Sequence, residues 1–281
     1  MQVIIDPMAM ARWSAEQRAL GLRVGFVPTM GALHKGHMAL VRQAREACDV
    51  VVVSIFVNPL QFTDPEDLRR YPRRQVADAE LLTREGCDVL FTPTEQGIYA
   101  GHTTRKYALG GLDEVLEGVS RPGHFQGMLN VVERLFHYVR PDEAFFGEKD
   151  RQQLTIVQHV AVTRRWPERI IPGPTVREED GLAMSSRNLR LSPEQRAIAP
   201  LLYTSLEQVA AVAFKQPWSE CRRQALAVLA QEPSIQVDYL RIARPTTLLE
   251  LTDDEQPETA LVLVAATLGD VRLIDNIAVH R

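Results

Sequence analysis

The sequence has little cysteine, no excess of basic residues and no long apolar run. Its three cysteines, Cys48, Cys87 and Cys221, stand far apart without metal-ligand spacing, which predicts no disulfide framework and favours a reducing compartment. The 32 basic and 36 acidic residues give a net charge of -4, which argues against a broad surface for nucleic acid or anionic membranes. Asp6 and Pro7 interrupt the stretch where a signal peptide would be apolar, so we expect a cytoplasmic protein.

What the sequence does contain is enough apolar material for a sizeable core. Its 281 residues are 45% hydrophobic and 24% charged, which is typical of a folded globular protein of one large domain or two. Strand-like runs alternate with helical patterns: "VGFVPT" (24–29) precedes "HMALVRQAREA" (37–47), and "DVVVVSIFVN" (49–58) follows. This order predicts a βαβ unit with strands buried on both faces.

The same alternation continues along the chain. Residues 63–86 predict a helix with Thr63 or Asp64 as its N-cap and Pro65 just inside it, followed by a strand within 87–93. Residues 124–139 show helical spacing of apolar side chains, and 143–160 are typical of strand, turn and helix. We therefore predict an α/β fold, a doubly wound parallel sheet, for a first domain over residues 1–175.

Near residue 171 the composition of the sequence changes, and proline, glycine and charged residues become frequent. Ser192 is a predicted N-cap, with Pro193 at the first helical position and Gln195 completing a capping box. Three strand-like runs follow, at 235–244, 259–268 and 271–279. These patterns predict a second, smaller α+β domain over residues 176–281.

Two loops occupy the positions where parallel sheets bind ligands, at the carboxyl ends of strands and the starts of helices. In "TMGALHKGH" (29–37), Gly31 and Gly36 would let the backbone approach a ligand, and His34 and His37 could donate hydrogen bonds to phosphate. Two alternatives remain open. The histidines could ligate a metal, although no third ligand is evident, or they could simply start a helix.

Other segments add to this pattern. Lys149, in "GEKD" (147–150), could meet phosphate as a point charge, although single lysines are usually solvated. "MSSRN" (184–188) has the composition of a flexible loop that closes on a triphosphate, although serine and asparagine also suit a helix cap. "RPGHF" (121–125) could be only a helix entry. Together these features indicate a nucleotide site.

An ordered set of longer motifs carries a family resemblance. "PTMGALHKGH", "SIFVNPLQF", "YPR", "SRPGHFQGM", "FGEKDRQQL", "PTVREEDGLAMSSRN" and "GDVRLIDN" occur between about residues 23 and 276 in the order typical of pantothenate synthetases, the pantoate–beta-alanine ligases. The resemblance implies a Rossmann-like first domain of the nucleotidyltransferase superfamily, a C-terminal lid domain and a homodimer. It also implies condensation of (R)-pantoate with beta-alanine through a pantoyl adenylate, with ATP and Mg²⁺.

The resemblance also assigns site residues. His37 matches the family's proton donor, and His34 and Lys149 are the other implied catalytic residues. Gln61 matches a contact to pantoate and beta-alanine, and Gln153 a contact to pantoate. The implied ATP-binding residues are Met30, Gly31, Ala32, Leu33, His34, Lys35, Gly36, His37, Gly147, Glu148, Lys149, Asp150, Val176, Met184, Ser185, Ser186 and Arg187. Positive charge on the histidines, Lys149 and Arg187 would offset charge that moves onto pyrophosphate. The metal ligands are not implied.

Three positions depart from the family pattern: Asn130 and Arg74 stand where threonine is common, and Ala100 where proline is frequent. Parts of the sequence also suit two other functions. An adenylating enzyme like a class I aminoacyl-tRNA synthetase would need a basic RNA-binding surface, which the acidic balance disfavours. A non-catalytic nucleotide-binding module would be favoured by lesions at His37, Lys149 or Gln61, and all three residues are intact. For the homodimer, the apolar run "VVVVSIFV" (50–57) suggests an interface in the first domain.

Overall fold

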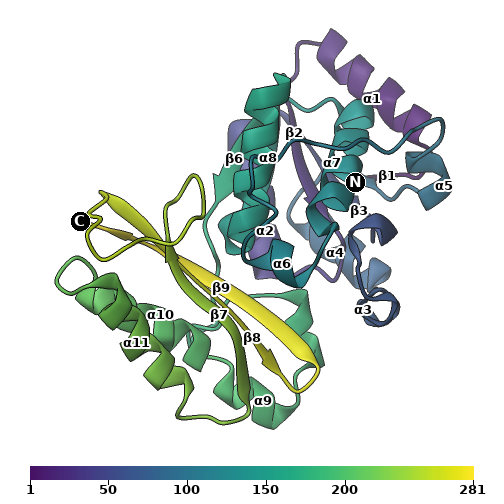
Figure 1. The fold of residues 1–281 in the computed structure, drawn as a ribbon. Coiled ribbons are helices and arrows are strands. Elements are labelled where there is room, and N and C mark those ends of the chain that lie inside the picture. The colour runs from purple at the N-terminus through teal and green to yellow at the C-terminus, as the bar shows by residue number, and fades with distance from the viewer. The chain divides into compact units, whose positions relative to one another are not determined.

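A computed structural model describes residues 1–281 and divides the chain into two compact units (Figure 1). The first unit comprises residues 1–148 and 153–174, and the second comprises residues 149–152 and 175–281. No helix in either unit has both the length and the apolar character that crossing a membrane requires.

The first unit is built on a six-stranded parallel sheet. Its strands are β1 (Gln2–Ile4), β2 (Val24–Thr29), β3 (Val50–Ile55), β4 (Val89–Phe91), β5 (Glu143–Gly147) and β6 (Arg169–Gly173). They lie in the order β1-β4-β3-β2-β5-β6, and every pair is parallel. The direction of winding reverses between β2 and β5, so the predicted doubly wound, Rossmann-like sheet is confirmed.

Helices connect these strands and flank the sheet (Figure 1). They are α1 (Pro7–Ala19), α2 (Lys35–Ala47), α3 (Pro65–Arg70), α4 (Gln75–Arg84), α5 (Glu95–Ile98), α6 (Glu117–Ser120), α7 (His124–Val139) and α8 (Arg151–Arg164), with 3-10 turns η1 (Pro59–Gln61) and η2 (Glu148–Asp150). The predicted helix at 63–86 is two helices. Asp64 caps α3 as expected, but Tyr71 has an extended backbone, because Pro72 disfavours a helical conformation in the residue before it.

β3 lies in the interior of the sheet, between β2 and β4. Val51, Val52 and Val53 have no exposed surface, because helices of the same chain cover both faces of the strand. The central part of the apolar run at 50–57 is therefore core, so this run gives no support to a dimer interface.

The second unit packs helices on a three-stranded antiparallel sheet of order β7-β8-β9. Its strands are β7 (Ile235–Ala243), β8 (Thr259–Leu268) and β9 (Val271–His280), and its helices are α9 (Pro193–Ile198), α10 (Leu201–Val212) and α11 (Trp218–Leu229), preceded by the 3-10 turn η3 (Ser186–Arg190). Both the predicted α+β class and the capping box of Ser192 and Gln195 are found. The helix predicted to begin after Ser192 ends at Ile198, and Pro200 separates it from α10.

Candidate active site

The candidate site of the first unit lies where the winding of the sheet reverses. The loop after β2 starts at Met30, and the neighbouring strand β5 ends at Gly147. Because parallel strands bring their carboxyl ends to one edge, these two segments share the edge at which such sheets bind ligands. The topology therefore supports the placement of the first nucleotide motif and the start of the second.

The backbone of the loop after β2 is held by side chains. The Gly31 N–H donates to Thr29 Oγ1 at 3.2 Å. Asp78, on α4, accepts the Ala32 N–H on Oδ2 and the Leu33 N–H on Oδ1, both at 2.8 Å. Gly31 and Ala32 have φ angles of +86° and +51°, so two successive residues occupy the left-handed region. The loop is thus a tight turn whose backbone is held by side-chain hydrogen bonds.

His34 and His37 form a capping box at the start of α2. The Gly36 N–H donates to His34 Nδ1 at 3.2 Å, and the His34 N–H donates to His37 Nδ1 at 3.3 Å. The ring centroids are 4.0 Å apart. A nitrogen that accepts a hydrogen bond carries no proton, so each neutral ring carries its hydrogen on Nε2. The histidines are therefore helix caps and also hold one N–H donor each in a fixed tautomer.

This geometry adds to the expectations from the sequence. Five N–H groups between residues 31 and 36 donate to protein side chains, so the backbone of the loop is bonded within the protein. Each imidazole uses Nδ1 in the cap, which directs its Nε2 away from the helix start. Side-chain donors are therefore the groups of this loop that suit phosphate oxygens.

Gln61 is brought next to the loop by η1, which follows β3. Its side chain is 6% exposed. Gln61 Nε2 lies 2.9 Å from the sulfur of Met30, and Gln61 Oε1 accepts from Asn58 Nδ2 at 3.2 Å. The Asn58 bond fixes which end of the Gln61 amide carries the oxygen. A thioether is a weak acceptor, so a carboxylate or hydroxyl can replace Met30 as the partner of the Gln61 amide.

Asn58 is fully buried and fully bonded. Besides Gln61 it donates to the Gly127 carbonyl at 3.1 Å and accepts from the Tyr99 hydroxyl at 2.7 Å. Burial raises the pKa of Tyr99, so its hydroxyl stays protonated and remains a donor. Gly127 must lack a side chain here, because a Cβ would lie 1.9 Å from the Leu60 carbonyl oxygen.

His124, at the start of α7, holds the Gln61 backbone. Its Nδ1 lies 2.6 Å from the Gln61 carbonyl oxygen, and Arg121 Nη1 lies 3.4 Å from its Nε2. The carbonyl can only accept, so His124 carries its hydrogen on Nδ1, the opposite tautomer to that of His34 and His37. The "RPGHF" segment is a helix entry, as the simpler interpretation held, and it also anchors Gln61.

A cavity of about 150 Å³ adjoins the loop at the carboxyl ends of β2, β3 and β4. Its lining residues are Met30, Gly31, Ile55, Phe56, Val57, Arg73, Arg74, Gln75, Asp78, Thr92 and Pro93. Arg74, one of the departures from the family pattern, therefore lines a cavity beside the candidate site. Asn130, another departure, is fully buried, accepts the Arg105 N–H at 2.8 Å and donates to the Arg105 carbonyl at 2.9 Å.

The remaining predicted residues of the first unit lie around β5. Gly147 ends the strand, Glu148 starts η2, and Gln153 is half-buried in the first turn of α8. A Cβ on Gly147 would meet no atom within 4 Å, so its backbone borders open space. In this unit the structure brings Gln61 into contact with Met30 and places the two histidines side by side.

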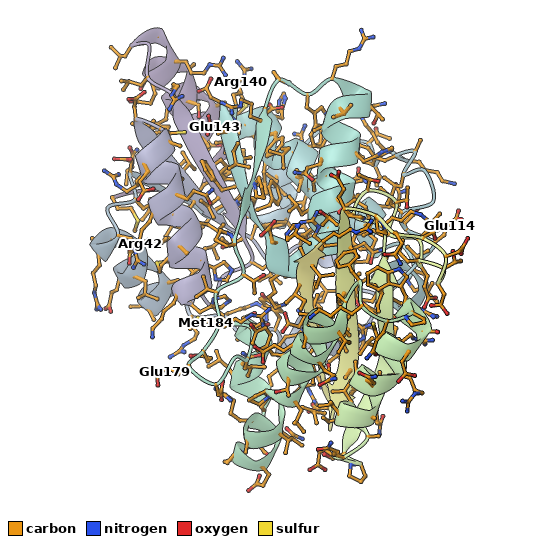
Figure 2. All side chains as sticks on the ribbon, turned by 90° about the vertical axis from the view of Figure 1, so that its left-hand side faces the viewer. Arg42, Glu114, Arg140, Glu143, Glu179 and Met184 are labelled. Atoms are coloured by element: carbon orange, nitrogen blue, oxygen red, sulfur yellow. The ribbon has the colours of Figure 1, made fainter.

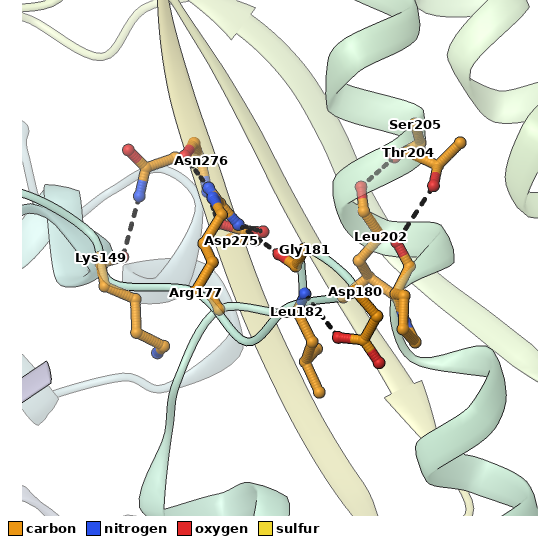
Figure 3. Close-up of polar contacts among 12 residues, drawn as sticks. Lys149, Arg177, Asp180, Gly181, Leu182, Leu202, Thr204, Ser205, Asp275 and Asn276 are labelled. Atoms are coloured by element: carbon orange, nitrogen blue, oxygen red, sulfur yellow. Dashed lines mark hydrogen bonds and ion pairs between the residues drawn. The ribbon is translucent and has the colours of Figure 1, made fainter. Parts of the chain in front are cut away.

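Lys149 and Asp150 belong to the second unit. The Lys149 side chain is 18% exposed and its Nζ lies 3.8 Å from Asp150 Oδ1, so it is not an ordinary solvated lysine. The Lys149 carbonyl accepts from Asn276 Nδ2 on β9 at 2.9 Å (Figure 3). The chain therefore ties the backbone of the lysine to the sheet of the second unit.

Val176 and Met184 lie opposite each other in a hairpin. The Met184 N–H donates to the Val176 carbonyl at 3.0 Å, and the turn contains Gly181 with φ +90°. Arg177 joins the hairpin to β9 by a two-bond ion pair with Asp275, at 2.6 and 3.0 Å (Figure 3). Burial raises the pKa of Asp275 and the Arg177 guanidinium opposes that shift. Figure 2 labels Met184 and Glu179 on this hairpin.

The predicted closing loop at 184–188 leads into the 3-10 turn η3, which begins at Ser186. Ser185 caps η3 by accepting the Arg187 N–H at 3.2 Å, and Asn188 Nδ2 donates to the Ala183 carbonyl at 3.0 Å. Ser186 is buried and Arg187 is half-buried. The capping role that the composition allowed for serine is found at Ser185.

Four residues of the site were given no role from the sequence. Asn58, Tyr99 and His124 fix Gln61, and Asp78 fixes the loop after β2. Asn58 and His124 stand inside motifs that were recognised, so a signal was present. Asp78 stands in a helical pattern where an acidic residue is typical of a solvated face, and only its burial shows otherwise.

Comparisons with known proteins agree with the geometry. The profile of the family Pantoate-beta-alanine ligase matches residues 2–278. Pantothenate synthetase from Pseudomonas fluorescens is 46% identical over 264 residues, 92% of each chain, and that of Cytophaga hutchinsonii is 42% identical over 268 residues, 94% of each chain.

Solved structures match as fully. Pantothenate synthetase from Thermus thermophilus is 45% identical with a TM-score of 0.90 over 99% of both chains. Pantoate-beta-alanine ligase from Francisella tularensis, complexed with beta-gamma ATP and beta-alanine, is 33% identical with a TM-score of 0.80, covering 99% of this chain and 97% of that one.

Proposed function

Because the chain belongs to the pantoate–beta-alanine ligase family, we propose that it condenses (R)-pantoate with beta-alanine and splits ATP into AMP and pyrophosphate. The observation that carries the proposal is the pairing, in one unit, of a fixed histidine pair with an oriented Gln61 amide beside Met30. The first is suited to phosphate and the second to a hydroxy acid. The relative from Francisella tularensis, complexed with beta-gamma ATP and beta-alanine, supports ATP and the amine as the other two substrates.

The reaction proceeds in two steps in this proposal. A carboxylate resists attack by an amine until one of its oxygens becomes part of a leaving group. A carboxylate oxygen of pantoate attacks the α-phosphorus of ATP, and the bond from that phosphorus to pyrophosphate breaks. The amine of beta-alanine then attacks the carbonyl carbon of pantoyl adenylate, AMP departs with the bridging oxygen, and the nitrogen loses a proton. Both steps balance without any redox partner.

The side chains divide this work according to their chemistry. His34 and His37 donate from Nε2 to phosphate oxygens as negative charge develops there, with His37 as the proton donor. Gln61 exchanges its bond to Met30 for bonds to pantoate and later to beta-alanine, and Gln153 provides a second neutral contact to pantoate. Lys149 and Arg187 supply positive charge to the nucleotide phosphates. These roles rest on the family motif and are supported by the bonding described above.

The nucleotide-binding residues proposed here come from both units. They comprise residues 30–37 and 147–150, Val176 and residues 184–187, and we assign residues 176–281 the role of a lid domain that excludes water from the adenylate. The tied hairpin that carries Val176 and Met184 supports this role, because a lid must keep its own shape while it moves as a body. A cytoplasmic location fits the small number of cysteines.

Mg²⁺ is proposed as the metal that accompanies ATP. No group of three or more histidine, cysteine, aspartate or glutamate side chains forms a preformed metal cage in this chain. Both Asp78 oxygens accept backbone N–H groups, so that carboxylate is not a natural ligand. Mg²⁺ commonly binds through substrate phosphates, its waters and one or two carboxylates, which this chain can accommodate. When bound, it would neutralise part of the charge on pyrophosphate.

Pyrophosphate exchange tests the two-step order. Labelled pyrophosphate should enter ATP when pantoate and Mg²⁺ are present, and beta-alanine should not be needed, because adenylate forms before the amine reacts. The measurement is the label in ATP with each substrate omitted in turn. Exchange that requires beta-alanine would contradict the two-step order. Exchange that requires tRNA would support a synthetase-like enzyme, and nucleotide binding without exchange or product would support a non-catalytic module.

Substitutions at His37 separate the roles of its two ring nitrogens, Nδ1 and Nε2. His37→Ala should lower the rate of adenylate formation by roughly two to three orders of magnitude, the usual cost of losing a transition-state donor. His37→Asn places an acceptor near the position of Nδ1 but has no Nε2 donor, so it should keep the helix cap and be about as slow as alanine. His37→Gln can place an N–H near the position of Nε2 and should retain more activity.

Single-turnover assays and thermal unfolding of the wild type and these variants measure the effects together. If His37→Asn forms adenylate at the wild-type rate, the donor role of Nε2 is wrong. Metal analysis of the purified wild type covers the remaining alternative, since stoichiometric zinc would identify the histidines as metal ligands.

A homodimer is the proposed assembly, as the family resemblance implies. The chain should sediment with about twice the monomer mass at micromolar concentration, as expected for a symmetric dimer, the commonest homo-oligomer. Sedimentation velocity over a dilution series measures this. A monomer throughout that series would contradict the proposal without affecting the assignment of the reaction.

A further inference from the structure

A buried carboxylate stands behind the histidine loop. Asp78 lies in the first turn of α4, far from the loop in sequence, and is 1% exposed. Its two oxygens each accept one backbone N–H at 2.8 Å, from Ala32 and from Leu33. Adjacent N–H groups that point to the same side match the two oxygens of one carboxylate, and a charged acceptor makes both bonds stronger than a neutral one would.

The loop needs such a tie because its backbone is strained. Ala32 has φ +51° although it carries a Cβ, and that conformation is unfavourable for residues other than glycine. Gly31 has φ +86°, and a Cβ there would lie 3.0 Å from Ile55 Cγ2 and 3.2 Å from Asp78 Oδ2. Without the carboxylate, the free backbone would relax toward ordinary dihedral angles.

The strained residues lead directly into the histidine pair. Leu33 precedes His34, whose N–H donates to His37 Nδ1 at 3.3 Å. The path of the backbone at 32–33 therefore sets where the His34 N–H points and so where the His37 ring lies. We infer that Asp78 is a positioning residue for the adenylation step. It holds the backbone of residues 32–34 and thereby orients the two Nε2 donors. This inference rests on the proposed function.

The role differs from that of a base or a metal ligand. Both oxygens of Asp78 are already engaged with backbone N–H groups, so neither has to leave the loop for chemistry. Both the charge and the two-oxygen shape of the Asp78 carboxylate are needed to hold the loop. An asparagine has only one oxygen, and its NH₂ group would face a backbone N–H at the other position, so one of the two ties is replaced by opposed donors.

Asp142 provides a matched control. It also accepts a backbone N–H of the β2 region at 2.8 Å, that of Val24, but at the amino end of the strand. Asp142 is half-buried and accepts this single N–H, so Asp142→Asn removes the charge of a carboxylate on the same strand but keeps one oxygen for the bond, away from the histidine loop. A lower rate caused by general weakening of the sheet should appear in both variants. A lower rate caused by misplaced histidine donors should appear only in Asp78→Asn.

Single-turnover adenylate formation, with steady-state constants for pantoate and ATP, tests the inference. Asp78→Asn should lower kcat by about 10-fold to 100-fold, the usual effect of a small misplacement of catalytic groups, with KM for pantoate within about twofold. Asp142→Asn should keep a rate close to that of the wild type. Nitrogen-15 spectra of the imidazoles should show the Nε2–H tautomer for His34 and His37 in the wild type and a tautomer mixture in Asp78→Asn.

The possible outcomes distinguish failure of this inference from failure of the proposed function. A wild-type adenylation rate in folded Asp78→Asn would overturn the inference, as would equal losses in Asp78→Asn and Asp142→Asn. A wild type that forms no adenylate would instead refute the proposed function. If Asp78→Asn does not fold, replacing Leu33 by its α-hydroxy analogue removes one N–H and leaves the carboxylate intact. A lower kcat with an unchanged KM for pantoate would then support the inference, and an unchanged kcat would overturn it.

Discussion

The candidate site depends on how one short loop satisfies its own backbone. Buried N–H groups must find acceptors, and the loop after β2 has no neighbouring strand to supply them. Thr29, Asp78, His34 and His37 provide the acceptors instead. This bonding fixes a strained backbone, begins α2 and sets the tautomers of two imidazoles at once.

The consequence is a division of labour that differs from a glycine-rich phosphate loop. In such a loop the backbone N–H groups bind the ligand, whereas here they bind the protein, and our proposal assigns recognition to imidazole, amide, ammonium and guanidinium side chains. Gln61 follows the same logic, because Asn58, itself held by Tyr99, bonds its side-chain amide and His124 bonds its backbone carbonyl. Its weak bond to Met30 can be given up to a substrate at small cost.

Much of the architecture was predictable because it follows from local patterns. The apolar runs of β2 and β3, the spacing in α7 and the Ser192 capping box each identify an element within a few residues of sequence. The splits at Pro72 and Pro200 could be missed because apolar spacing continues across them. The short edge strand β1 has too few residues to produce a pattern. It is recognisable only from its pairing with β4.

The candidate site was predictable as a set of motifs but not as a set of contacts. Nothing near Asp78 in sequence shows that both its oxygens face a loop some 45 residues away, and His37 could not be known to accept through Nδ1 before its partner was located. In the proposed reaction this arrangement serves attack of a carboxylate on the α-phosphate of ATP. Pantoate labelled with oxygen-18 in its carboxylate tests this attack most directly. One labelled oxygen should appear in AMP and none in pyrophosphate. Unlabelled AMP, or label in pyrophosphate or free phosphate, would contradict it.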